Sequence, residues 1–106
     1  MRAVGEVMFV ALSRFIIANG MVEEVHEAFR NRPHLVDRAP GFLGMQVMHP
    51  HDDTREIWLF TQWMDENCYT AWHRSHDYHA SHLGIPKGLK VVPKSAEIRL
   101  FNVFAT

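Results

Sequence analysis

The chain has 106 residues and a single cysteine, Cys68, so it has no internal disulfide and fits a reducing compartment. It also lacks a charge excess, since 11 lysines and arginines stand against 12 aspartates and glutamates and no basic tract occurs. Nucleic-acid binding normally takes a basic excess, so we expect no nucleic-acid partner. The N-terminal apolar run is interrupted by Arg14 and is too short to span a bilayer. We therefore expect a cytoplasmic protein with no signal peptide and no membrane partner.

Several signatures of enzymes are also missing. The sequence contains no nucleophile elbow, glycine-rich phosphate loop, pair of catalytic carboxylates or cysteine–histidine dyad that can be identified. Hydrophobic residues make up 47% of the chain and charged residues 22%, which excludes a disordered or low-complexity protein. A chain of this length folds as one domain without disulfides or a structural metal.

The hydrophobic pattern predicts four strands and two helical regions. The strands are expected at 7–17, 42–48, 56–63 and 97–104. One amphipathic helix is expected at 21–30, and a second helical region runs from Glu66 to about Leu83 with a break at Ser75. The order βαββαβ is typical of the α+β ferredoxin-like fold, a four-stranded antiparallel sheet with helices on one face.

The first and third strands are apolar on both faces, and two helices cannot cover both. Phe9 and Val10 point to opposite faces of the first strand, as do Leu59 and Trp58 in the third. An open apolar face of this size exceeds what monomers tolerate, so we infer a homodimer in which two sheets close face to face. In the alternative interpretation, the loop at 86–96 folds over this face.

Eight histidines are the unusual feature of the composition, and four of them recur at every third residue: His73, His76, His79 and His82. Each step of three residues on a helix falls about 60° short of a full turn, so the four rings cannot converge on one ion. We expect no dedicated non-haem metal site, and most of these rings to face solvent. One of the four, exposed to a pocket, is a candidate axial ligand to a haem iron. The other four are interpreted as surface or capping residues: His26, His34, His49 and His51.

The three tryptophans have different expected environments. Trp63 ends the third strand and is expected in the core, whereas Trp58 faces the opposite side, toward the inferred dimer interface. Trp72 lies on the helix face that meets the sheet, where core packing and an aromatic-lined pocket explain it equally well. Tyr69 and Tyr78 are expected to line the same space. In the second of these interpretations, the pocket takes a small planar aromatic ligand as a partner.

Four short segments resemble one known family. They are Phe9-Val10-Ala11-Leu12-Ser13-Arg14-Phe15, Pro40-Gly41-Phe42, Trp63-Met64-Asp65, and Trp72-His73-Arg74-Ser75 with its continuation to His82. The chain resembles the antibiotic biosynthesis monooxygenase superfamily from about residue 8 to 103, and within it is most similar to the IsdG-type haem-degrading monooxygenases. The resemblance implies one domain of this kind over 1–106, and a dimer of ferredoxin-like subunits whose sheets close into a dimeric α+β barrel.

The resemblance also implies roles for individual residues. His82 falls on the family's axial haem ligand, and Trp72, ten residues earlier, falls on the tryptophan that distorts the porphyrin. The family's asparagine on the first strand, which helps to orient oxygen, falls on Ser13, whose hydroxyl lacks the reach of an amide. Haem binding is expected to survive this change more readily than efficient degradation. Arg74 is a candidate partner for haem carboxylates on the chemistry of its guanidinium alone.

Three functions therefore stay open at this point. The first is a haem-binding monooxygenase that oxidises haem, as both cofactor and substrate, or another planar aromatic substrate with O2. The second is a cofactor-free monooxygenase acting on a phenolic or polycyclic aromatic substrate. The third is a non-enzymatic haem-binding dimer. The pair formed by His82 and Trp72 does not separate these classes.

Overall fold

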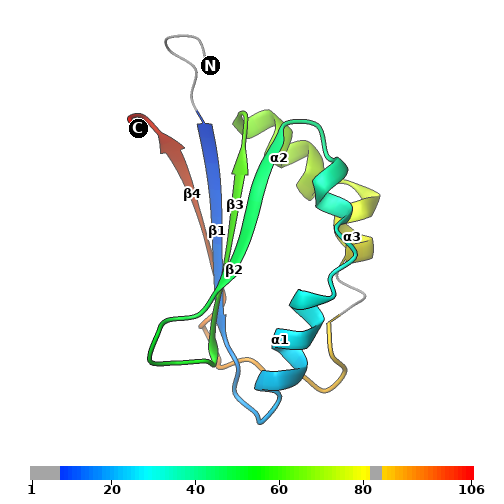
Figure 1. Ribbon diagram of the computed structural model, residues 1–106, viewed down its shortest axis with the longest axis vertical. Helices are drawn as coiled ribbons and strands as arrows, with labels where there is room; N and C mark the ends of the chain where they lie inside the picture. Colours follow the sequence, from blue (N-terminus) through cyan, green and yellow to red (C-terminus); the bar gives the residue numbers. More distant parts are fainter. Residues whose placement is uncertain (1–7, 82–84) are drawn as a thin grey trace.

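The computed structural model describes residues 8–81 and 85–106 and has the expected ferredoxin-like architecture (Figure 1). Its elements are β1 (Met8–Ile16), α1 (Val22–Arg30), the 3-10 helix η1 (Leu35–Arg38), β2 (Phe42–Met48), β3 (Glu56–Trp63), α2 (Glu66–His73), α3 (His76–Ser81) and β4 (Glu97–Val103). The four strands form one antiparallel sheet in the order β2-β3-β1-β4, and the helices lie on one of its faces (Figure 1). Within the described ranges, no helix is long and apolar enough to cross a membrane.

Local capping explains where the second helical region starts and breaks. Asp65 precedes α2 and accepts a hydrogen bond from the backbone N–H of Cys68 at 2.9 Å, which satisfies a donor of the first turn. This bond lowers the pKa of the Asp65 carboxyl because it stabilises the charged form. Ser75 separates α2 from α3, and its hydroxyl accepts a hydrogen bond from the N–H of Tyr78 at 3.1 Å. The expected break at Ser75 is confirmed.

The core on the helix side of the sheet has two parts. At one end, Trp63 and Phe9 pack with Val36 of η1. At the other end, Ile57 of β3 packs with Val25 of α1 and with Ile17 just after β1. Trp63 is fully buried, as its position at the end of the third strand predicts.

Most of the opposite face of the sheet is open in the described chain, although Val10 on this face is only 6% exposed. Trp58 lies on this face in register with Arg14, whose guanidinium is 5.6 Å from the centre of the indole ring. Met48 and Phe101 on the same face are 42% and 38% exposed. Leu89 of the connection before β4 packs instead into the helix-side core. Leu89 therefore does not cover the open face as the alternative interpretation expects, whereas the carbonyl of Ser95 at the end of the loop accepts a hydrogen bond from Arg14 of that face at 3.4 Å.

Gly41, at the entry to β2, is a position where only glycine fits without strain. Its φ is 77°, and a Cβ there would meet the side chain of Cys68, whose own Cβ would be 2.8 Å away. We expect Gly41→Ala to lower the free energy of unfolding by about 2–4 kcal/mol, because backbone strain and overpacking add. Urea denaturation measures this change.

Gly44 provides the matched control for that measurement. It lies in β2, has an ordinary φ, and a Cβ added there meets nothing within 4 Å. Gly44→Ala is expected to change the free energy of unfolding by less than about 0.5 kcal/mol. Equal losses in the two variants would contradict the close approach of Cys68 to Gly41.

Candidate functional site

Ser13 lies at the centre of an apolar surface on the helix-facing side of the sheet. It is in register with Leu59 of β3 on one side and Ile98 of β4 on the other. Ala11, two residues away on the same face, is in register with Leu100. We call Ala11, Ser13, Leu59, Ile98 and Leu100 the apolar wall.

The part of the apolar wall on β4 is not covered by the helices. Ile98 and Leu100 are 56% and 49% exposed although they point to the helix side of the sheet. Neither core cluster of the described residues includes a residue of β4. An exposed apolar surface of this kind often marks a binding site for an apolar ligand or partner.

An aromatic group on α2 and α3 faces the same layer. The ring of Tyr69 lies 5.7 Å from Phe9 and 5.6 Å from His73, and the ring of His73 lies 4.4 Å from Tyr78. Burial, and to a smaller extent the nearby Tyr78, raise the pKa of Tyr69, so its hydroxyl stays protonated at neutral pH. His73 therefore lies between two phenol rings, an arrangement that the sequence analysis had not singled out.

Trp72 is oriented toward η1. Its ring packs against the core cluster of Phe9, Val36 and Trp63 and makes an edge contact with Tyr78 at 6.1 Å. Trp72 also lines a cavity of about 370 Å³ between η1 and α2. Phe9 is four residues before Ser13 on β1, which corresponds to roughly 13 Å along a strand. Trp72 thus contacts the sheet at the Phe9 end, away from the row that contains Ser13.

The remaining two residues predicted for the site are Arg74 and His82, and only Arg74 is among the described residues. Arg74 is the C-cap residue that directly follows α2; it is exposed and has no ion pair within the described part of the chain. His82 lies outside the described residues. Ser13 and the Tyr69 group therefore face one layer, whereas the structure leaves the placement of the proposed iron ligand untested. Among the described residues, no cluster of three or more histidine, cysteine, aspartate or glutamate side chains is arranged to hold a metal ion.

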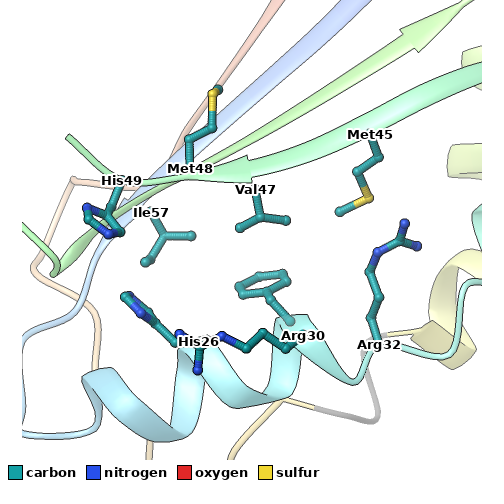
Figure 2. A pocket seen from close by; sticks show the side chains of 9 residues that line it. His26, Arg30, Arg32, Met45, Val47, Met48, His49 and Ile57 are labelled. Carbon is teal, nitrogen blue, oxygen red and sulfur yellow. The ribbon is translucent and has the colours of Figure 1, made fainter. Parts of the chain in front are cut away.

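A second cavity lies between α1 and the hairpin that joins β2 to β3. It has a volume of about 360 Å³, and His26 of α1 and His49 after β2 both line it (Figure 2). The two rings stack with centroids 5.4 Å apart and planes at 14°. The expected surface position of these two histidines stands, because the hydrogen bonds of both rings are exposed, but their stacking on each other was not predicted. No sequence signal links positions that lie on separate elements, so only the fold reveals the pair.

Comparison with known proteins adds to this geometry. The family model described as antibiotic biosynthesis monooxygenase matches residues 8–83. A heme oxygenase (mycobilin-producing) of Mycobacterium tuberculosis is 29% identical over 63 residues, which cover 59% of this chain and 60% of that protein. The match therefore spans about three fifths of the length of this curated relative.

Two solved structures share the fold over most of the chain. The heme-degrader MhuD from Mycobacterium tuberculosis, with two hemes bound in its active site, has a TM-score of 0.73 and 24% identity over 92% of this chain and 97% of its own. SnoaB, a cofactor-independent oxygenase from Streptomyces nogalater, has a TM-score of 0.73 and 16% identity over 93% of this chain and 95% of its own. The same architecture thus occurs in a heme-degrading protein and in an oxygenase without a cofactor.

Proposed function

The chain belongs to the antibiotic biosynthesis monooxygenase family, and from this premise we propose that it is a haem-binding monooxygenase that oxidises haem, or another planar aromatic substrate, with O2. The observation that carries the proposal is the apolar wall, whose β4 part is exposed beside the Ser13 hydroxyl. The heme oxygenase and the heme-degrader among its relatives support the choice of haem.

The residues of the wall fit a porphyrin. A porphyrin has two apolar faces, and Ile98 and Leu100 offer apolar side chains that are otherwise left in water. Burying this surface is favourable by about 25 cal/mol per Å². A macrocycle extends over several residues of a strand, so a ring placed over Ser13 also reaches toward the Tyr69 end of the sheet.

Each candidate residue has a separate task in this proposal. His82 holds the iron through its imidazole, and Arg74 pairs with a carboxylate of the ligand. Trp72 and Tyr78 limit the space beside the ring and exclude water. The Ser13 hydroxyl donates a hydrogen bond toward the place where O2 enters. Haem itself supplies the iron that activates O2 and the ring that is oxidised.

Titration with hemin tests the proposal. We expect the wild-type protein to shift the Soret band of hemin at micromolar concentration and His82→Ala to abolish the shift, because this variant removes the imidazole that would hold the iron. His76→Ala is the matched control, since His76 is an exposed histidine six residues earlier in the same region and keeps the shift. The absence of a band shift with wild-type protein would refute haem binding.

Addition of ascorbate under air to the hemin complex separates an enzyme from a carrier. A monooxygenase bleaches the Soret band, whereas a non-enzymatic haem-binding dimer keeps it. The serine at position 13 favours the carrier to some extent, because a hydroxyl replaces the family's amide. Ser13→Asn then becomes informative, since bleaching gained by this variant assigns the deficit to the shorter reach of the serine hydroxyl compared with an amide N–H.

A cofactor-free monooxygenase acting on a phenolic or polycyclic aromatic substrate is the second candidate. The observation that favours it is His73 between the rings of Tyr69 and Tyr78, because an imidazole in an aromatic pocket is a suitable base for a phenol. Its structural relative SnoaB is described as a cofactor-independent oxygenase. Oxygen consumption by haem-free, metal-free protein with a phenolic substrate, lost in His73→Phe, would favour this function over haem oxidation.

We propose in addition that the protein is a homodimer whose subunits associate through the open face of the sheet. The support is a group of apolar residues on this face, where Leu12 lies in register with Phe60, and Met48 and Phe101 are 42% and 38% exposed; the ion pairs of Arg14 with Glu56 and Glu97 lie on the same face. A second copy offers the same apolar surface, so a two-fold arrangement buries both.

A further inference from the structure

The cavity between α1 and the β2–β3 hairpin has an apolar middle and polar ends. Phe29 of α1, together with Val47 and Ile57 of the sheet, forms the apolar part. In Figure 2, His26 and His49 lie at one end of the cavity and Arg32 lies near Met45 at the other. The volume of about 360 Å³ is at the lower end of the range for small-molecule sites, which suits a ligand of one or two rings.

The hydrogen bonds of the two histidines determine which ring nitrogens carry a proton. Nε2 of His26 lies 3.0 Å from the carbonyl oxygen of Thr54, and Nδ1 of His49 lies 2.7 Å from that of Pro50. A carbonyl oxygen only accepts, so these two nitrogens donate and hold the proton of the neutral ring. Nδ1 of His26 and Nε2 of His49 are then hydrogen-bond acceptors. This end of the cavity therefore suits a ligand hydroxyl that donates.

The other end has donors for an anion. One terminal nitrogen of Arg32 bonds to Asp37 at 3.3 Å, which leaves the rest of its planar guanidinium to donate to a second group. Arg30 also lines the cavity, but its side chain extends toward His26 rather than Arg32 (Figure 2), and its guanidinium bonds to Glu27 at 3.3 Å through one nitrogen. A guanidinium binds a carboxylate with two parallel hydrogen bonds, and more strongly than it binds a neutral group.

From these three features we propose that this cavity is a binding site for a hydroxylated aromatic carboxylate. The carboxylate pairs with Arg32, the ring lies against Phe29 and Val47, and the hydroxyl donates to the acceptor nitrogen of His26 or His49. The site is distinct from the apolar wall around Ser13, although Val47, Leu59 and Ser13 lie in one row across the sheet. The proposal goes beyond the proposed function, and binding here requires neither haem nor turnover.

Isothermal titration with 6-hydroxy-2-naphthoate on the haem-free protein tests the site. We expect saturable binding, and about tenfold weaker binding of 2-naphthol, which lacks the carboxylate. We expect weaker binding of 2-naphthoate too, because it lacks the hydroxyl. Arg32→Gln is expected to weaken the binding of 6-hydroxy-2-naphthoate about tenfold but to leave that of 2-naphthol unchanged.

Arg55→Gln is the matched control for the arginine variant. Arg55 lies in the same hairpin, pairs with Asp53 at 3.3 Å and does not line the cavity, so its replacement leaves the affinity unchanged. Nitrogen-15 NMR of the imidazoles provides an independent measurement. We expect 6-hydroxy-2-naphthoate to change the chemical shift of the unprotonated ring nitrogen of His26 or His49, and 2-naphthoate, which has no hydroxyl, to leave it unchanged. His26→Phe and His49→Phe are each checked for folding by circular dichroism. We expect these variants to bind 6-hydroxy-2-naphthoate no more tightly than 2-naphthoate.

Three results would overturn the proposal. The first is no saturable binding of 6-hydroxy-2-naphthoate at millimolar concentration. The second is an affinity that is the same for wild type and Arg32→Gln. The third is amide chemical-shift changes on α2 and β4 rather than on α1 and the hairpin, which would place the ligand on the apolar wall. The hemin titration is independent of all three, so failure here leaves the proposed oxygenase function standing.

Discussion

Replacing Trp63 with alanine is expected to lower the free energy of unfolding by about 3–5 kcal/mol, a large share of the stability of a domain of this size. The side chain is fully buried and is the largest in the core. It makes edge contacts with Phe42 at 5.4 Å and Tyr69 at 5.9 Å, and its indole N–H donates to the hydroxyl of Thr61 at 3.0 Å. Alanine loses these contacts and leaves a cavity under α2.

Urea denaturation followed by circular dichroism measures this loss. Trp63→Phe is the conservative control and is expected to lose less than half as much, because it keeps an aromatic ring in the cavity and loses only the Thr61 hydrogen bond and part of the packing. Tyr69 contacts Trp63 directly, so Trp63→Ala also moves the aromatic group of α2. A loss of less than about 1 kcal/mol for the alanine variant would contradict the central place of Trp63 in the core.

The sheet could be predicted from the sequence because each strand has its own apolar run, which can be recognised without knowing the rest of the fold. Alternation at positions such as Trp58 and Leu59 shows which side chains share a face, and the register of β1 with β3 confirms it. The 3-10 helix η1 had no such signal. It has only four residues, too few for a helical period, and it starts after His34, which adopts a left-handed φ of 58°. Its single buried residue, Val36, nevertheless completes the core under Trp72.

The candidate site could be predicted only in part, for physical reasons. Ser13 is placed by strand alternation, which is a local property. The exposure of Ile98 and Leu100 depends instead on how far the helix layer extends over the sheet, and local sequence does not encode this extent. The pairing of His26 with His49 likewise requires α1 to lie beside the hairpin. Resemblance to a family points to Trp72, but its orientation toward η1 becomes visible only in the fold.

One face of β4 is proposed to form the dimer interface and the other to bind the ligand. A charge placed on one face at a time therefore tests the homodimer. Phe101 lies on the open face in register with Val10, whereas Ile98 lies on the apolar wall in register with Ser13. We expect Phe101→Glu to weaken the dimer about 100-fold, since a two-fold interface would bury two carboxylates in place of two apolar rings, and Arg99, whose guanidinium lies 5.6 Å from the Phe101 ring, offsets part of this cost. Analytical ultracentrifugation measures the change as a shift from dimer to monomer.

Ile98→Glu is the matched control, because it puts the same charge on the same strand but on the other face. This variant is expected to stay dimeric and to bind hemin more weakly, since the carboxylate disturbs the apolar wall. Phe101→Glu is expected to keep the contacts of the wall, because its side chain points away from it. A wild-type protein that sediments as a monomer would refute the homodimer. Loss of the dimer in Ile98→Glu, with Phe101→Glu still dimeric, would place the interface on the helix side and remove the wall as a ligand surface.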